Sequence, residues 1–187
     1  MVVSAAHTGS QPDTVVVKLG NAIVANANDT FREWKETSVS QRVRFMLKYQ
    51  ELLKQHQDDI AAMITKEHGK SLIDAKGDIF RGYEVVEHAC SFGSLSMGES
   101  VENVAKGVDI YSYRTPLGVC GGIAPFNFPA MIPLWMYPLA ITLGNTFVLK
   151  PSEKVAGTTN ILVDLLEQSG IPKGVVNIVQ GGRDTVT

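Results

Sequence analysis

Residues 115–153 combine the features that chemistry at the edge of a sheet requires. A glycine-rich apolar run ends at Pro125, where the amide of Asn127 follows, and a second apolar run ends on Lys150 and then Glu153. A helix-length segment separates the two runs, which predicts a strand, a helix and a second strand. Because parallel strands joined in this way open their carboxyl ends at the same edge, we expect the polar groups to border one ligand site.

Asn127 has two interpretations. It lies between Pro125 and Pro129, which stiffen the turn and hold the amide in a set direction. A fixed amide donor at a sheet edge can stabilise an oxyanion. Asparagine is also a common N-cap for a helix that begins with proline, and the spacing alone favours this cap. The glycines of the preceding strand do not match the G-x-G-x-x-G dinucleotide fingerprint.

Lys150 and Glu153 flank Pro151 and Ser152 at the end of the second strand. A cation and an acid in this place can bind the hydroxyls of a ribose, and the acid would repel a 2′-phosphate. The alternative is a solvated lysine followed by a helix whose first turn contains Ser152 and Glu153. The spacing leaves both interpretations open.

Arg81 lies between Phe80 and Tyr83 on an otherwise apolar helical segment. Its guanidinium could receive a substrate carboxylate through two parallel hydrogen bonds. Pairing with a neighbouring acid is the more common role for such an arginine.

The spacing of apolar residues, which predicts the helices and strands that position these side chains, differs between the two halves of the chain. The second half predicts a β-α-β-α-β series, because short apolar or β-branched runs alternate with helix-length segments. The runs are residues 119–124, 145–149 and 175–179, and the helices are residues 131–143 and 158–169. Gly144 and Gly170 end the two helices. The series predicts three parallel strands with right-handed crossovers.

The first half predicts helices over residues 21–34, 40–69 and 71–92. In the second of these, Ser40 is the expected N-cap, and Val43, Leu47, Leu52 and Leu53 are the expected buried stripe. A polar break at residues 55–59 makes it one bent helix or two. A short strand at residues 109–113 leads into the second half.

We therefore expect an α/β fold with a helical N-terminal part. The expected divisions are residues 1–20, an unassigned or disordered terminus, residues 21–114, a helical part, and residues 115–187, an α/β part. The chain has 187 residues, of which 44% are hydrophobic, so it can bury a substantial core.

Composition excludes several classes of function. The net charge of −2 shows no basic patch, so we expect no nucleic-acid partner. The longest apolar stretch is too short to span a bilayer, so we expect no membrane anchor. Cys90 and Cys120 form no CxxC motif and have no histidine at ligand spacing, which predicts reduced core thiols in an intracellular protein and no metal site. The first twenty residues fit neither a secretory signal nor a mitochondrial presequence.

Several segments together resemble the aldehyde dehydrogenase superfamily. They are IAPFNFP, GNTFVLKPSE and SGIPKGVVNIVQG. Phe126, where most members carry tryptophan, and the segments GDIFRGYEVVEHAC, YSYRTPLGVC and NFPAMIPLWMYPLA are similar to the CoA-acylating methylmalonate-semialdehyde dehydrogenases. The resemblance runs from about Asn21 to the C-terminus and implies that residues 115–187 are the first half of a Rossmann-like NAD-binding domain.

The resemblance implies a cofactor site around two loops. Asn127 would be the oxyanion-hole amide, acting with a backbone N–H of the nucleophilic cysteine. Lys150 and Glu153 would hold the adenosine ribose of NAD, and the adjacent Ser152 and Lys154 would belong to the same cofactor site. Ala124, Pro125 and Phe126 would line the nicotinamide path. The resemblance also implies that Arg81 recognises the carboxylate of malonate semialdehyde or its methyl homologue.

The implied reaction is the NAD-dependent, CoA-acylating oxidation of methylmalonate or malonate semialdehyde to propionyl-CoA or acetyl-CoA, in valine and pyrimidine breakdown. NAD is then the cofactor, coenzyme A the co-substrate, and a homo-oligomer the expected state of the full-length protein. The family's catalytic cysteine falls beyond residue 187, so we expect a truncated, N-terminal portion that is inactive alone.

Two alternatives stay open. One is a portion of a hydrolytic NAD(P)-dependent aldehyde dehydrogenase, and the other is a non-catalytic module that binds nucleotide or docks to full-length subunits. The resemblance implies the mitochondrial matrix for a eukaryotic source and the cytoplasm otherwise.

Overall fold

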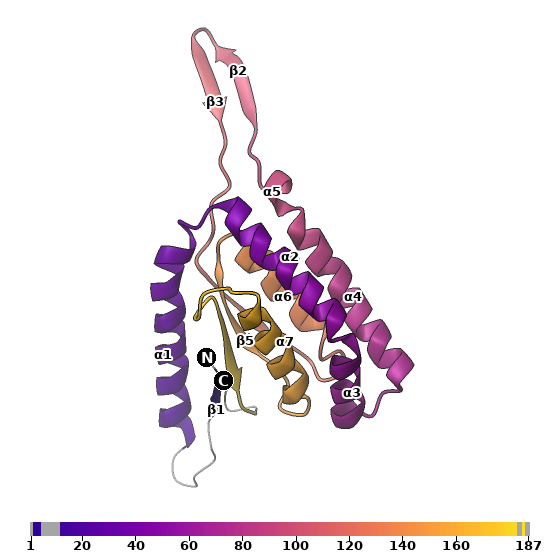
Figure 1. Ribbon diagram of the computed structural model, residues 1–187. Helices are drawn as coiled ribbons and strands as arrows, with labels where there is room; N and C mark the ends of the chain where they lie inside the picture. Colours follow the sequence, from indigo (N-terminus) through magenta and orange to yellow (C-terminus); the bar gives the residue numbers. More distant parts are fainter. Residues whose placement is uncertain (1, 5–11, 183–184, 186–187) are drawn as a thin grey trace.

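The computed structural model describes residues 2–4, 12–182 and 185, with side chains from residue 21 onward. A four-stranded parallel sheet with the strand order β1-β6-β5-β4 forms the centre of the molecule. The strands are β1 (Val2–Ser4), β4 (Val119–Ile123), β5 (Thr146–Lys150) and β6 (Val176–Gln180). Helices lie on both sides of this sheet, as Figure 1 shows. The α/β class and the helical N-terminal part are confirmed.

The predicted β-α-β-α-β series is present. Helix α6 (Met131–Thr142) connects β4 to β5, and α7 (Ala156–Gln168) connects β5 to β6. Gly144 and Gly170 follow these helices with φ angles of 93° and 91°, the left-handed conformation that glycine adopts without strain. Three strands therefore carry their carboxyl ends to one edge of the sheet.

The two faces of the sheet have different covers. Alternate residues of β5 and β6, including Phe147, Leu149 and Ile178, are buried in the core cluster with residues of α6 and α7. Helix α1 (Pro12–Trp34) lies against the other face, where the Thr146 hydroxyl donates to the carbonyl of Ala27 at 2.9 Å. This single helix covers its face only in part.

A helical layer packs over α6 and α7 (Figure 1). It consists of α2 (Val39–Gln55), α3 (Gln57–His68), α4 (Leu72–Cys90) and the short α5 (Phe92–Leu95). The predicted polar break thus separates two helices. The expected N-cap was wrong: the Ser38 hydroxyl, and not Ser40, accepts from the N–H of Gln41 at 3.3 Å.

The first helix and the N-terminal strand differ from the expectation. Helix α1 begins at Pro12, nine residues before the expected start, and proline is compatible with a first helical turn because its missing N–H has no partner there. Strand β1 pairs in parallel with β6 through Val2–Ser4. Residues 1 and 5–11 lie outside the described residues, so the expected disorder of the terminus and the proposed domain boundaries stay predictions.

A hairpin of β2 (Ser100–Ala105) and β3 (Val108–Tyr111) projects from the body (Figure 1). Its second strand corresponds to the short strand expected at residues 109–113, but its first strand was not predicted. All ten of its strand residues are exposed. Without a buried face, the sequence of the first strand shows no clear alternation of apolar and polar residues. None of the described helices is long and apolar enough to cross a membrane.

Candidate functional site

Two loops meet at the carboxyl edge of the sheet. The first loop, residues 124–130, follows β4, and the second loop, residues 151–155, follows β5. The two strands are in register up to the pair Ile123 and Lys150, and the N–H of Ala124 then donates to the carbonyl of Lys150 at 2.9 Å. The polar residues of both loops therefore border one region, as the sequence predicted.

Asn127 is exposed on the first loop, and its side chain makes no hydrogen bond within the part of the chain that the structure describes. The helix-cap interpretation was wrong, because α6 begins at Met131 with Ala130 as its N-cap residue. The cap is supplied from another helix, since the Asp78 carboxylate accepts from the N–H of Met131 at 2.8 Å. The amide of Asn127 is thus available to a ligand.

Lys150 and Glu153 form an ion pair, with Nζ 3.2 Å from Oε2. The side chain of Lys150 is 12% exposed and that of Glu153 is 54% exposed, so the ammonium is fixed against the protein while the carboxylate faces solvent. A hydrogen bond from its own backbone N–H, followed by the Lys150 ammonium, lowers the pKa of the Glu153 carboxyl below its usual value. The pair presents an anionic acceptor and a cationic donor side by side.

The rest of the second loop is ordered by its own turn and by Phe126. The hydroxyl of Ser152, a buried residue, accepts from the N–H of Lys154 at 3.3 Å. The Lys154 ammonium lies 4.9 Å from the centre of the Phe126 ring, which also stacks on His68 with 5.9 Å between ring centres. Phe126 therefore joins the two loops. Pro125, the neighbour of Phe126, is exposed.

Arg81 reaches the same side of the molecule from α4. Together with Phe128 of the first loop it lines a shallow hollow of about 300 Å³, which also includes Lys70 and Ile73. Within the described ranges Arg81 forms no ion pair with a neighbouring acid, although Asp74 lines the same hollow, and its guanidinium donates a hydrogen bond to the carbonyl of Gly77 at 3.4 Å. The side chain of Arg81 is exposed.

Three charged residues of the site were missed in the sequence analysis. Asp78, which is fully buried, binds the Lys70 ammonium at 2.9 Å as well as the N–H of Met131. Glu67 accepts from the N–H groups of Gly157 and Thr158 at the start of α7, at 2.8 and 3.1 Å. An acid at helical spacing from apolar neighbours gives a weak sequence signal, because solvated acids have the same pattern.

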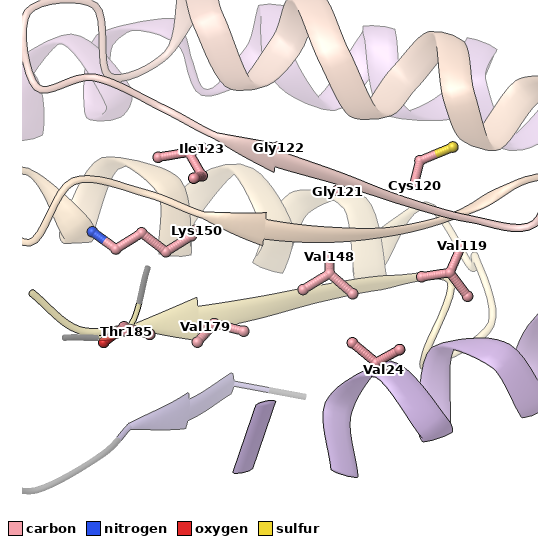
Figure 2. A pocket seen from close by; sticks show the side chains of 10 residues that line it. All are labelled: Val24, Val119, Cys120, Gly121, Gly122, Ile123, Val148, Lys150, Val179 and Thr185. Carbon is pink, nitrogen blue, oxygen red and sulfur yellow. The ribbon is translucent and has the colours of Figure 1, made fainter. Parts of the chain in front are cut away.

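An open apolar hollow of about 650 Å³ lies along the half-covered face of the sheet (Figure 2). Valines of three strands and of α1 line it, and Lys150 closes the end at the carboxyl edge. The lining valines are Val24, Val119, Val148 and Val179. An apolar wall next to an ammonium and a carboxylate suits a nucleoside, which has a flat base and a ribose with hydroxyls.

Neither cysteine has the character of a nucleophile. Burial, with a further contribution from Glu87, raises the pKa of Cys90 to about 11. Burial also raises the pKa of Cys120. Both thiols are protonated at neutral pH, and thiols in this state attack carbonyls poorly. Both cysteines were expected in the core, and both are partly buried and pack against it.

Comparison with known proteins identifies the family. The model of the aldehyde dehydrogenase family matches residues 14–187. The chain belongs to the aldehyde dehydrogenase family. A relative from Dictyostelium discoideum, named probable methylmalonate-semialdehyde/malonate-semialdehyde dehydrogenase, acylating and mitochondrial, is 60% identical over 165 residues. The match covers 88% of this chain and 31% of that protein.

Solved aldehyde dehydrogenases share the fold of this chain. A methylmalonate-semialdehyde dehydrogenase from Oceanimonas doudoroffii is 45% identical, with a TM-score of 0.88 over 90% of this chain and 35% of that one. A structure from Sinorhizobium meliloti, complexed with NAD, is 40% identical, with a TM-score of 0.87 over 91% of this chain and 35% of that one. This aldehyde dehydrogenase chain therefore spans about a third of the length of the relatives it matches.

Proposed function

We propose that this chain forms the oxyanion and adenosine half of the site in an NAD-dependent, CoA-acylating dehydrogenase of methylmalonate or malonate semialdehyde. The observation that carries the proposal is the junction of the two loops. There the free amide of Asn127 and the Lys150–Glu153 pair border one edge of the sheet. The 60% identity to a relative of that name supports the substrate.

The residues present fit NAD. Glu153 offers acceptors and Lys150 a donor for the two hydroxyls of the adenosine ribose, while Ser152 and Lys154 support the same loop. The apolar hollow beside Lys150 supports a place for the base. NAD, when bound, accepts the hydride that leaves the substrate carbon.

The remaining roles concern the substrate. We assign the amide of Asn127 to the substrate oxygen, where an N–H donor stabilises the negative charge that develops as a thiolate attacks the aldehyde. Ala124, Pro125 and Phe126 would form the wall along which the nicotinamide reaches the reacting carbon. Arg81 would bind the substrate carboxylate, since its guanidinium is exposed and lacks an acid partner in the described part of the chain.

Coenzyme A would receive the acyl group, with loss of carbon dioxide, to give propionyl-CoA or acetyl-CoA. For a eukaryotic source we propose the mitochondrial matrix, because the names of several relatives describe mitochondrial proteins.

A chimera tests this proposal. The 165-residue stretch matched in the Dictyostelium discoideum protein is replaced by the corresponding stretch of this chain. NADH formation is then measured with malonate semialdehyde and coenzyme A. We expect turnover comparable to the parent enzyme, and a fall of about 100-fold or more in kcat when Asn127 is changed to Ala. A folded chimera that binds NAD but shows no turnover with semialdehydes would refute the assigned function.

A further inference from the structure

The end of α3 and the turn that follows it contact the first loop of the site and the start of α7, which directly follows the second loop. Glu67, His68 and Lys70 are almost consecutive in the sequence, yet their side chains contact different parts of the α/β half. Glu67 binds the start of α7, immediately after the second loop, and His68 stacks on Phe126 of the first loop. Lys70 lies 4.3 Å from the ring centre of Phe128, also in the first loop.

The contact of Glu67 replaces a helix cap. Helix α7 has no side-chain cap from its own N-cap residue, Val155. The two carboxylate oxygens of Glu67 instead accept from the N–H of Gly157, the N–H of Thr158 and the hydroxyl of Thr158, at 2.8, 3.1 and 3.3 Å. A Cβ atom at residue 157 would lie 2.7 Å from Glu67 Oε1, so a larger residue there would displace the carboxylate from this position.

The contact of Asp78 does the same for α6. That helix also lacks a side-chain cap of its own, and the Asp78 carboxylate accepts from Met131 at 2.8 Å with one oxygen. Its other oxygen binds Lys70 at 2.9 Å, and both side chains are largely or fully buried, at 15% and 0% exposure. An anion at a helix N-terminus is favourable because N–H groups there have no partner within the helix.

We propose that the α3–α4 turn, together with Asp78, is a brace that holds the two loops at a fixed separation. The brace comprises Glu67, His68, Lys70 and Asp78. It fixes the start of α6 directly after the loop of Asn127 and the start of α7 directly after the loop of Lys150 and Glu153. Its members are positioning residues, because each acts through a loop and none needs to touch a ligand.

The brace has a consequence for the cofactor. Both crossover helices present their N-termini at the carboxyl edge, and both termini are already occupied by carboxylates of this chain. Helix N-termini commonly bind phosphate, but here the N–H groups of Met131, Gly157 and Thr158 already donate to Asp78 and Glu67. The phosphates of a bound dinucleotide must therefore be held by other groups, while the ribose contacts depend on loops that the brace keeps in place.

Amide hydrogen exchange on the purified chain, measured residue by residue without NAD, tests the brace. The variants are Glu67→Gln and Asp78→Asn, which keep the side-chain shape but remove the charge. The control is Glu84→Gln, an exposed position on α4. We expect about tenfold faster exchange at Gly157 and Thr158 in the first variant and near Met131 in the second. Exchange in β5 should not change.

A purely structural role would instead lower the melting temperature and speed exchange in β5 as well. If Asp78→Asn does not fold, Glu67→Gln still tests the brace at the start of α7, because its contacts there do not involve Asp78. Wild-type exchange rates at both helix starts in the folded variants would overturn the brace.

The ligand part of this inference rests on the proposed NAD site and has a separate readout. Calorimetric titration with NAD should show a several-fold weaker affinity in Glu67→Gln and Asp78→Asn than in the wild type and the control. Faster loop exchange with unchanged NAD affinity would overturn the link between brace and ligand. A wild-type chain that binds no NAD would refute the proposed cofactor site, and the exchange data would still decide whether the brace holds the loops.

Discussion

Lys150 is the last residue of β5, and its Nζ lies 3.2 Å from Oε2 of Glu153, three residues further along the chain. The side chain of Lys150 is 12% exposed and that of Glu153 is 54% exposed, so the carboxylate is the member of the pair that solvent and ligands can reach. Its negative charge faces the place proposed for the ribose. The preference for NAD or NADP that Glu153 would cause can therefore be measured on the chain itself.

We expect the chain to bind NAD weakly and to prefer it over NADP by about tenfold or more, because the 2′-phosphate would face the like charge of Glu153. Glu153→Gln should reduce this preference. Calorimetric titration with both cofactors measures it, and Glu102→Gln, an exposed change in the hairpin, is the control. Equal affinities of the wild type for NAD and NADP would exclude the assigned role of Glu153.

Arg81 should matter only for substrates with a carboxylate. In the chimera described above, Arg81→Leu should lower kcat/KM for malonate semialdehyde by about 10- to 100-fold, because a hydrogen bond to a charged group contributes about 1.5–3 kcal/mol. Propanal has no carboxylate to bind Arg81, so its kcat/KM should not change. The comparison of the two substrates is therefore its own control, and equal losses on both would show that Arg81 is structural.

In the α/β half, the local spacing of apolar residues was sufficient to predict the strands and helices. Strand β4 was expected at residues 119–124 and is Val119–Ile123, and β6 was expected at residues 175–179 and is Val176–Gln180. These elements depend on apolar runs and on Gly144 and Gly170, all of which are signals within a few residues. The positions of the two loops could then be predicted as well, because each loop begins where one of those strands ends.

Contacts between distant segments could not be predicted in the same way. The bonds from Asp78 to Met131 and from Glu67 to Gly157 join residues 53 and 90 positions apart. Their formation depends on how the helical layer packs over α6 and α7, and one sequence contains no spacing that encodes this. The proposed roles of Asn127, Lys150, Glu153 and Arg81 came from the resemblance, since the residues alone left alternatives open.

Arg42 illustrates a second limit. The expected stripe of α2 included Val43 and Leu47, whereas the buried residues are Arg42, Met46, Tyr49 and Leu53. A hydropathy pattern treats arginine as a solvent-facing residue. Here the buried guanidinium donates to the carbonyl of Thr142 at the end of α6 and to the carbonyls of Lys35 and Thr37 in the connection that follows α1.

We expect Arg42→Ala to lower the free energy of unfolding by about 2–3 kcal/mol, because the carbonyl of Thr142, 2.9 Å from Arg42 Nε, would lose its donor in a buried place. Chemical denaturation of the chain measures the change. Arg44→Ala, at an exposed position on the same helix, should change the stability by less than about 0.5 kcal/mol. Similar losses in both variants would contradict the role given to Arg42.

The chain should self-associate. Within the described residues β4 pairs only with β5, so its other edge presents unpaired N–H and C=O groups, and Ile123 on this strand is 60% exposed. Sedimentation velocity at several concentrations should show association, and Ile123→Lys should reduce it by placing a charge at the edge. Leu47→Lys, at an exposed position on α2, is the control. A stable monomer at all concentrations would contradict this expectation.

The chain alone should oxidise no aldehyde. Asn127 stabilises an oxyanion only after a nucleophile has attacked, and the two thiols present are poor nucleophiles, since the pKa of Cys90 is raised to about 11 and that of Cys120 is also raised. NADH formation should therefore equal the background without protein when malonate semialdehyde and coenzyme A are supplied. The chimera, assayed in parallel, shows that the reagents are competent. Turnover by the chain that disappears in Cys90→Ser or Cys120→Ser would show instead that one of these thiols becomes a thiolate during the reaction.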